Sequence, residues 1–278
     1  INTLPQWQII FKNHLGINKI WGSKNKKGIN TLIHLYKWIK IVKMSNYDLI
    51  IDLQTNDRSR IYLSVLKLLS NKIKYIIGNH AVKPYSIFPK TRIKITNPFQ
   101  MMQRTINSIG IKSNTFSPKI YTSKKDSVSS KSILKGNFLK KNNFVVLICG
   151  SNKRGKNKRW GAKNFNSLAD LIKKKFKYKS VLIGGPDDIN ECLSISKKDK
   201  TIINLCNKTN LIELIEIFSN ARFIISNDTG TAHLASSTKT PMIVITGPTD
   251  PKKVKPFGKK ILAVQANSKD MNGVTPAD

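Results

Sequence analysis

Short apolar runs alternate with longer stretches of helical periodicity along this chain. In the second half, the apolar runs predict six strands: Phe144–Cys149, Ser180–Gly184, Ile202–Leu205, Phe223–Ser226, Met242–Thr246 and Ile261–Val264. Amphipathic stretches between them predict four helices: Asn164–Lys175, Asp188–Ser196, Leu211–Phe218 and Thr229–Ser237. Nearly continuous apolar strands are typical of a parallel sheet that is buried on both faces. This half is therefore expected to be a doubly wound, Rossmann-like domain.

The first half carries a weaker pattern of the same kind. It predicts two strands and two helices, over Asp48–Leu53, Ile73–Ile77, Thr31–Met44 and Arg58–Leu69. Residues 79–120 are rich in Pro and predict no defined element. Ser and Lys dominate residues 122–136, and apolar periodicity is lost there, which is typical of a linker. We therefore predict an N-terminal domain over 1–135 and a C-terminal domain over 136–278.

Composition narrows the class of protein. Hydrophobic residues make up 40% of the 278 residues, which excludes global disorder. No apolar run approaches the roughly 18–20 residues that a membrane-spanning helix needs. The net charge of +34 is typical of proteins with a polyanionic partner, either nucleic acid or an anionic membrane surface. The alternative is a solvated surface whose Lys content, like the abundance of Asn and Ile, comes from AT-rich codons. Only seven of the 49 basic residues are Arg, the residue preferred for phosphate and base contacts, and this favours the membrane.

The three cysteines, Cys149, Cys192 and Cys206, lie in or beside apolar stretches. Their number is odd, and neither a CxxC pair nor a Cys/His ligand spacing is present. This pattern predicts buried reduced thiols rather than disulfides or a metal site.

The turn that follows the first C-terminal strand is basic and resembles a phosphate-binding loop. Gly150, Gly155 and Lys156 have the P-loop spacing, but Asn157 stands where a Ser or Thr would hold magnesium. A P-loop NTPase is therefore disfavoured. We expect backbone N–H groups and one Lys of this loop to bind a phosphate; the alternative is a solvated basic loop.

Two other turns allow a structural and a functional interpretation. Gly184 and Gly185 permit close approach of a ligand, or simply form a turn before an N-cap at Asp188. Thr249 and Asp250 either start a helix or line the same site.

The turn Ser226–Leu234 carries the sharpest signal. Asp228 is expected to cap the helix that follows, so that the N–H groups near Thr229 and Gly230 form an anion site. Thr229 and His233 are four residues apart and share a helical face. For His233, a ligand contact and a bond to a carbonyl both stay open. Together these turns suit a diphosphate better than a metal or a nucleophile.

Several of these segments match one known family. Asp228-Thr-Gly-Thr-Ala-His-Leu-Ala, followed by the segment 240–251 that contains Gly-Pro-Thr-Asp-Pro, resembles the signature of the bacterial lipopolysaccharide heptosyltransferases, glycosyltransferase family 9. Further matches in the same order are Tyr47–Gln54 with Arg58 and Ser59, Lys158-Arg159-Trp160, Leu182–Pro186 and Met271–Asp278.

The resemblance implies a GT-B fold, in which two Rossmann-like, doubly wound α/β domains face a cleft. It implies transfer of heptose from ADP-heptose to the inner core of lipopolysaccharide, on a lipid A–Kdo or core oligosaccharide acceptor. It also implies no required metal or other cofactor, no specific nucleic acid, and a cytoplasmic location with peripheral contact at the anionic inner membrane. Carried over by position, the donor-binding residues are Ser151, Lys158, Gly185, Asp228, Thr229, Gly230 and His233. Gln54 and Arg58 would lie on the acceptor side.

One departure leaves the catalytic base unassigned. The family opens with a Gly-Asp loop whose Asp is taken as that base, and the chain contains no Gly-Asp pair. The chain starts at Ile1, so we expect a fragment with a truncated N-terminal domain; the alternative is a non-catalytic relative. A basic nucleic-acid-binding protein is the alternative from another class.

Overall fold

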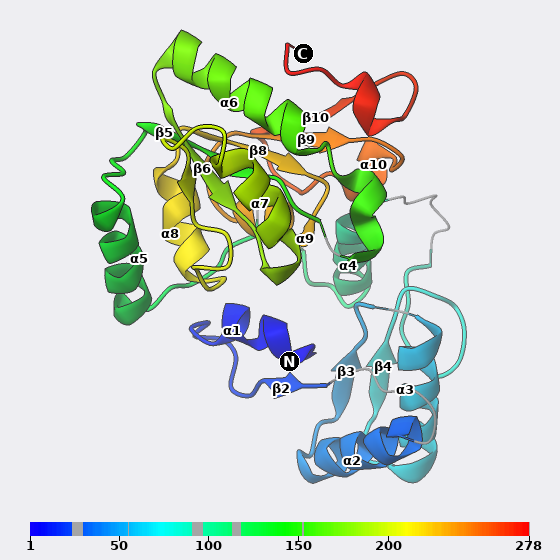
Figure 1. Cartoon of the computed structure of the whole chain (residues 1–278). Coiled ribbons are helices and arrows are strands. Elements are labelled where there is room, and N and C mark those ends of the chain that lie inside the picture. Colours follow the sequence, from blue (N-terminus) through cyan, green and yellow to red (C-terminus); the bar gives the residue numbers. More distant parts are fainter. Residues whose placement is uncertain (24–29, 55, 91–96, 113–117, 152, 278) are drawn as a thin grey trace. The chain divides into compact units, whose positions relative to one another are not determined.

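The computed structural model describes residues 1–23, 30–54, 56–90, 97–112, 118–151 and 153–277 (Figure 1). The chain folds into two compact units. The first comprises residues 1–8 and 19–115, and the second comprises residues 9–18 and 116–278.

The second unit contains a six-stranded parallel sheet with the order β10-β9-β8-β5-β6-β7. Its strands are β5 (Phe144–Ile148), β6 (Lys179–Ile183), β7 (Ile203–Asn204), β8 (Phe223–Asn227), β9 (Met242–Thr246) and β10 (Ile261–Gln265). Its helices are α5 (Lys124–Gly136), α6 (Ala162–Phe176), α7 (Ile189–Ser196), α8 (Glu213–Asn220), α9 (Gly230–Ala235) and α10 (Pro251–Val254). Short 3₁₀ turns lie at Lys153–Lys158, Pro186–Asp188 and Met271–Gly273. The six predicted strands and four predicted helices of this half are thus confirmed.

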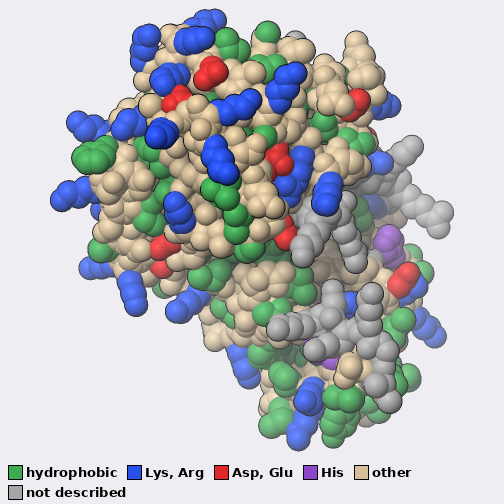
Figure 2. All heavy atoms as spheres, viewed as in Figure 1, with side chains coloured by type: hydrophobic (Ala, Val, Ile, Leu, Met, Phe, Trp, Pro, Cys, Tyr) green, Lys and Arg blue, Asp and Glu red, His purple; other side chains and the backbone are tan. Residues whose placement is uncertain are grey.

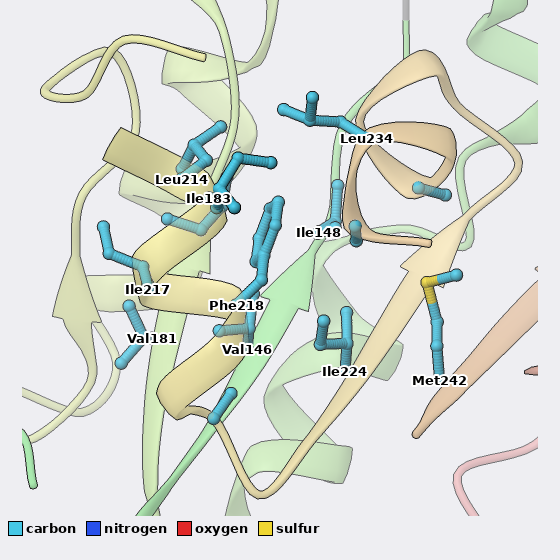
Figure 3. Close-up of a cluster of buried hydrophobic side chains, with 14 of the residues drawn as sticks. Val146, Ile148, Val181, Ile183, Leu214, Ile217, Phe218, Ile224, Leu234 and Met242 are labelled. Carbon is cyan, nitrogen blue, oxygen red and sulfur yellow. The ribbon is translucent and has the colours of Figure 1, made fainter. Parts of the chain in front are cut away.

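The residues of β5 alternate between two buried clusters, one on each face of the sheet. Phe144, Val146 and Ile148 pack with side chains of α5, α8 and α9 (Figure 3). Val145 and Leu147 pack on the other face with side chains of α6 and α7. Because neighbouring residues of a strand point to opposite faces, a strand covered on both sides has an uninterrupted apolar sequence.

The three cysteines are buried and free, as predicted.

Helix α5 corrects the predicted linker over 122–136. Ser123 and Asp126 form a capping box at its start, and the core-facing positions of the helix include Ser130 and Leu134. The hydroxyl of Ser129 donates to Glu213 of α8. Because a serine occupies a core-facing position, the apolar period of α5 is hidden in the sequence. The segment 116–135, which was predicted to close the first domain, belongs to the second unit instead.

The first unit is α/β but less regular. Its described strands form two parallel pairs, β1 (Asn2–Thr3) with β2 (Trp21–Gly22), and β3 (Leu49–Ile51) with β4 (Tyr75–Ile77). The helices are α2 (Asn30–Met44), α3 (Asp57–Leu69) and α4 (Pro98–Asn107), with η1 (Pro5–Trp7) near the start of the chain. The short helix α1 (Gln8–Phe11) follows η1, and its residues 9–11 belong to the second unit. The four elements predicted here are confirmed, and α4 lies in the stretch that predicted none. Among the described residues, no helix has both the length and the apolar character needed to cross a membrane.

Candidate functional site

The predicted turns lie where they were expected, after β5, β6, β8 and β9. These strands are parallel, so their carboxyl ends meet at one edge of the sheet. Asp228 lies in the turn after β8, and its hydrogen bonds connect this turn to the turns after β5 and β9. Its Oδ2 accepts a hydrogen bond from the ammonium of Lys158 at 2.7 Å and from the hydroxyl of Thr249 at 3.0 Å. Lys158 comes from the turn after β5, and Thr249 from the turn after β9.

Asp228 therefore does not cap the helix that follows it, and this prediction was wrong. The N-cap of α9 is Thr229, whose side chain makes no capping hydrogen bond. The carboxylate of Asp228 is only 8% exposed and pairs with a full positive charge instead. In the pair with Lys158 both partners are charged, whereas a cap would pair the carboxylate with a neutral N–H, and this favours the bond to Lys158.

Lys158 is held with part of its ammonium free for a ligand. Its side chain is 29% exposed, and an ammonium has three donors, of which Asp228 takes one. Thr229 is half-buried, and Gly230 and His233 are exposed at the same edge. In the described part of the chain the imidazole of His233 has no hydrogen-bond partner, so the carbonyl-bonded alternative is not found. The arrangement presents an ammonium, an imidazole and a hydroxyl along the edge of the sheet.

The pKa of His233 lies below its ordinary value of 6.5, mainly because the protein around the ring removes part of its hydration, although the side chain still reaches solvent. This partial loss of hydration disfavours the charged form of the ring. The charge of Lys158 lowers this pKa further, while Asp228 opposes the shift. We expect His233 to be neutral at pH 7 and to titrate below pH 6.5. An NMR titration of the imidazole Cε1 protons, with the His233→Gln variant for assignment, measures this. A midpoint above 6.5 would contradict the proposed loss of hydration around the ring.

Asp188 accepts hydrogen bonds from the backbone of two predicted donor-binding residues. It accepts from the backbone N–H of Ser151 at 3.1 Å and from that of Gly185 at 2.9 Å. Ser151 and Gly185 stay predicted donor-binding residues, but in this structure their backbone N–H groups donate to Asp188. Gly150 leaves room for this carboxylate, since a Cβ at this position would overlap the carboxyl group of Asp188 unless one of the two moved.

Arg159 connects the turn after β5 to the turn after β6, a role that the sequence did not predict. Its guanidinium donates to Asp188 at 2.8 Å and to Glu191 at 3.2 Å, and also to the carbonyl of Ser151 at 2.7 Å. Asp188 and Glu191 are three residues apart at the start of α7, a spacing that places both on one face. This pair of carboxylates is the signal that could have revealed the contact.

Asn227 is a second residue that the sequence analysis missed. It is fully buried at the end of β8, where its Oδ1 accepts from the backbone N–H of Trp160 at 3.2 Å, and its amide donates to the carbonyl of Cys149. The indole of Trp160 donates to the carbonyl of Val274 at 2.8 Å. These bonds fix the segment that carries Lys158 and Arg159.

The two residues predicted for the acceptor side, Gln54 and Arg58, belong to the first unit. Both are exposed, Gln54 just after β3 and Arg58 in the first turn of α3. The Gln54 backbone N–H donates to Asp52 at 3.0 Å. Asp52 is buried and accepts from the hydroxyl of Tyr85 at 2.7 Å. Burial and this carboxylate together raise the pKa of Tyr85 well above its ordinary value, so Tyr85 stays protonated as a donor.

A hollow of about 570 Å³ in the first unit lies within the stretch that the sequence left unassigned. Two cationic side chains, Lys90 and Arg104, help to line it, together with Ser86, Ile87, Phe88, Pro89, Asn107 and Ser108. Within the described residues, the buried Nε of Arg104 finds no hydrogen-bond partner. In the described ranges, no group of three or more His, Cys, Asp or Glu residues is placed to hold a metal ion.

The α/β units and the polar edge of the parallel sheet define a protein of the GT-B type. The model of glycosyltransferase family 9, described as heptosyltransferase, matches residues 35–275, and the chain belongs to this family.

Curated relatives and solved structures agree with this family. The chain is 27% identical over 127 residues to lipooligosaccharide heptosyltransferase 2 of Haemophilus influenzae, a match that covers 44% of this chain and 36% of that protein. It is 31% identical over 68 residues to lipopolysaccharide heptosyltransferase 1 of Escherichia coli O18:K1:H7, covering 24% and 21% of the two chains. The match thus spans about a third of the first relative's length and about a fifth of the second's.

The solved structures are alike in fold over almost the whole chain. The glycosyltransferase family 9 structure from Veillonella parvula superposes with a TM-score of 0.85 at 18% identity, covering 99% of this chain and 84% of that one. The E. coli heptosyltransferase WaaC with ADP gives a TM-score of 0.73 at 15% identity, covering 99% and 86%.

Proposed function

We propose that this protein is a glycosyltransferase that moves heptose from ADP-heptose to the inner core of lipopolysaccharide. The observation that carries the proposal is the cluster of Lys158, Asp228 and Thr249, which lies beside His233 at the carboxyl edge of the sheet. Family membership supports it, as do the solved structures of WaaC with ADP and with ADP-2-deoxy-2-fluoro heptose.

The donor diphosphate would lie against Lys158, Thr229, Gly230 and His233. As the bond to the sugar breaks, negative charge grows on the departing ADP and positive charge grows on the sugar. Lys158 would stabilise the departing diphosphate, a task for which many transferases use magnesium. Asp228 would position the ammonium of Lys158, since the two are paired at 2.7 Å. We propose that transfer needs no metal, which an assay with a chelator tests.

The acceptor would contact the first unit. Gln54 and Arg58 are our proposed acceptor-side residues, and the cations Lys90 and Arg104 suit the anionic groups of a lipid A–Kdo or core oligosaccharide acceptor. We assign no catalytic base to this chain. Because such an acceptor is anchored in lipid, we also propose a cytoplasmic protein with peripheral contact at the anionic inner membrane.

Calorimetric titration with ADP, UDP and GDP, without magnesium and at two salt concentrations, tests the donor site. We expect selective binding of ADP that persists at higher salt. Equal binding of all three nucleotides that is lost with salt would contradict the proposal, because the overall charge of +34 would then govern binding. A loss of nucleic-acid affinity with salt, by a log–log slope of about −0.9 per phosphate contact, would favour a nucleic-acid-binding protein instead.

His233→Ala is expected to weaken ADP binding without unfolding the chain, because in the proposed site the ring would lie against the diphosphate. His80→Ala is the matched control, since His80 is exposed and lies in the first unit. Unchanged ADP affinity in the His233 variant would remove that residue from the donor site. If the protein binds ADP normally but forms no ADP from ADP-heptose in the presence of acceptor, it is a non-catalytic relative.

A further inference from the structure

Helix α2 has apolar side chains on both of its faces. One face supplies Ile39 and Val42 to the core of the first unit, where they pack with Leu63 and Leu66. The opposite face exposes five large apolar side chains: Leu32 (65%), Ile33 (49%), Tyr36 (69%), Ile41 (43%) and Met44 (74%). A helix that is hydrophobic all round is normally buried all round. The outer face of α2 therefore has the composition of a contact surface.

Lysines are interleaved with these apolar side chains. Lys37, Lys40 and Lys43 are exposed on the same outer face, and α2 contains no Asp or Glu. Figure 2 shows hydrophobic and basic side chains together at the lower end of the view, where Figure 1 places α2. The sequence of the first unit holds 18 Lys and Arg but only three carboxylates, Asp48, Asp52 and Asp57.

The mixture of apolar side chains and lysines on α2 favours one of three possible partners over the other two. A second copy of the chain would bring the same positive charge against itself, which opposes association. Nucleic acid would satisfy the lysines but would leave the aliphatic side chains without apolar contacts. An anionic lipid surface satisfies both, because the apolar side chains enter the acyl boundary while lysines reach the head groups.

We propose that the outer face of α2 is the membrane-binding surface of this protein, and that it lies in the interface of an anionic lipid bilayer. Leu32, Tyr36 and Met44 insert among the acyl chains, and Lys37, Lys40 and Lys43 bind the acidic head groups. The inference rests on the proposed function for the presence of a lipid-borne acceptor.

The test is co-sedimentation of the full chain with vesicles rich in phosphatidylglycerol, and with vesicles of phosphatidylcholine alone. We expect binding to the anionic vesicles that is weakened, but not abolished, by salt, because apolar insertion is not screened. The triple variant Lys37→Gln/Lys40→Gln/Lys43→Gln should lower partitioning on the order of 100-fold at low salt. Leu32→Ser/Tyr36→Ser/Met44→Ser should lose the salt-resistant binding. All six residues are exposed, so these variants keep the core intact.

A matched control separates the α2 surface from the net charge of the chain. Lys174→Gln/Lys197→Gln/Lys200→Gln removes the same charge from exposed positions of the second unit and should bind vesicles almost as the parent does. An equal loss in this control would overturn the proposal, as would salt-resistant binding in the apolar variant. A dimer in solution that the α2 variants break would assign the face to a second copy instead. ADP affinity of the same variants tests the donor site separately, so the two proposals can fail independently.

Discussion

Replacing Lys158 by Ala is expected to lower the rate of sugar transfer by about 10²–10³-fold, the cost of removing one preorganised donor from a developing negative charge. Its ammonium lies 2.7 Å from Asp228, which is itself held by Thr249. Removal of Lys158 leaves the largely buried carboxylate of Asp228 without its counter-charge at the edge where the diphosphate would bind. We therefore expect ADP affinity to fall as well, because the remaining negative charge repels the ligand. Steady-state kinetics and calorimetry on the variant measure the two effects.

Two further variants show whether position or net charge causes the loss. Lys156→Ala removes the same charge from an exposed site two residues away and should leave transfer nearly unchanged. In the Lys158→Ala background, Asp228→Asn removes the unpaired carboxylate and should restore part of the ADP affinity. If Lys156→Ala were as damaging as Lys158→Ala, the proposed contact between Lys158 and the diphosphate would be wrong.

The fold of the second unit could be predicted from the sequence because its strands are buried on both faces. Phe144–Ile148 and Met242–Thr246 are continuous apolar runs that no surface helix or loop would carry. Helix α5 could not be predicted in this way, because Ser130 occupies a core-facing position and the period is lost. Where one polar residue replaces an apolar one in a short helix, periodicity no longer separates a helix from a linker.

The sequence predicted the location of the candidate site, at the carboxyl edge of the sheet, but not the hydrogen bonds between its side chains. Strand ends and turn residues located the edge of the sheet, because parallel strands end together. The partners depend on strand order instead: β5 lies between β8 and β6, so Lys158 meets Asp228 on one side and Arg159 meets Asp188 on the other. Helix-cap rules read only local sequence and therefore assigned Asp228 to its own helix.

Asp188→Ala is expected to destabilise the second unit by about 3 kcal/mol, the cost of breaking a largely buried ion pair from one side. Asp188 and Arg159 are 13% and 15% exposed, and the carboxylate also accepts the N–H groups of Ser151 and Gly185. Its removal leaves an arginine and two backbone donors with fewer partners. Urea unfolding of the full chain, followed by circular dichroism, measures the change. Asp170→Ala, which removes an exposed carboxylate of α6, is the control and should cost little.

Gly150→Ala tests the same contact by steric means. The new methyl would lie 1.9 Å from the carboxyl carbon of Asp188, so the carboxylate must leave its three donors or the turn after β5 must move. We expect a loss of stability comparable to that of Asp188→Ala. Because both changes break one network, their effects should be clearly less than additive in the double variant. Full additivity would mean that Gly150 is needed for a reason other than space for Asp188, and that the two turns are held together by other contacts.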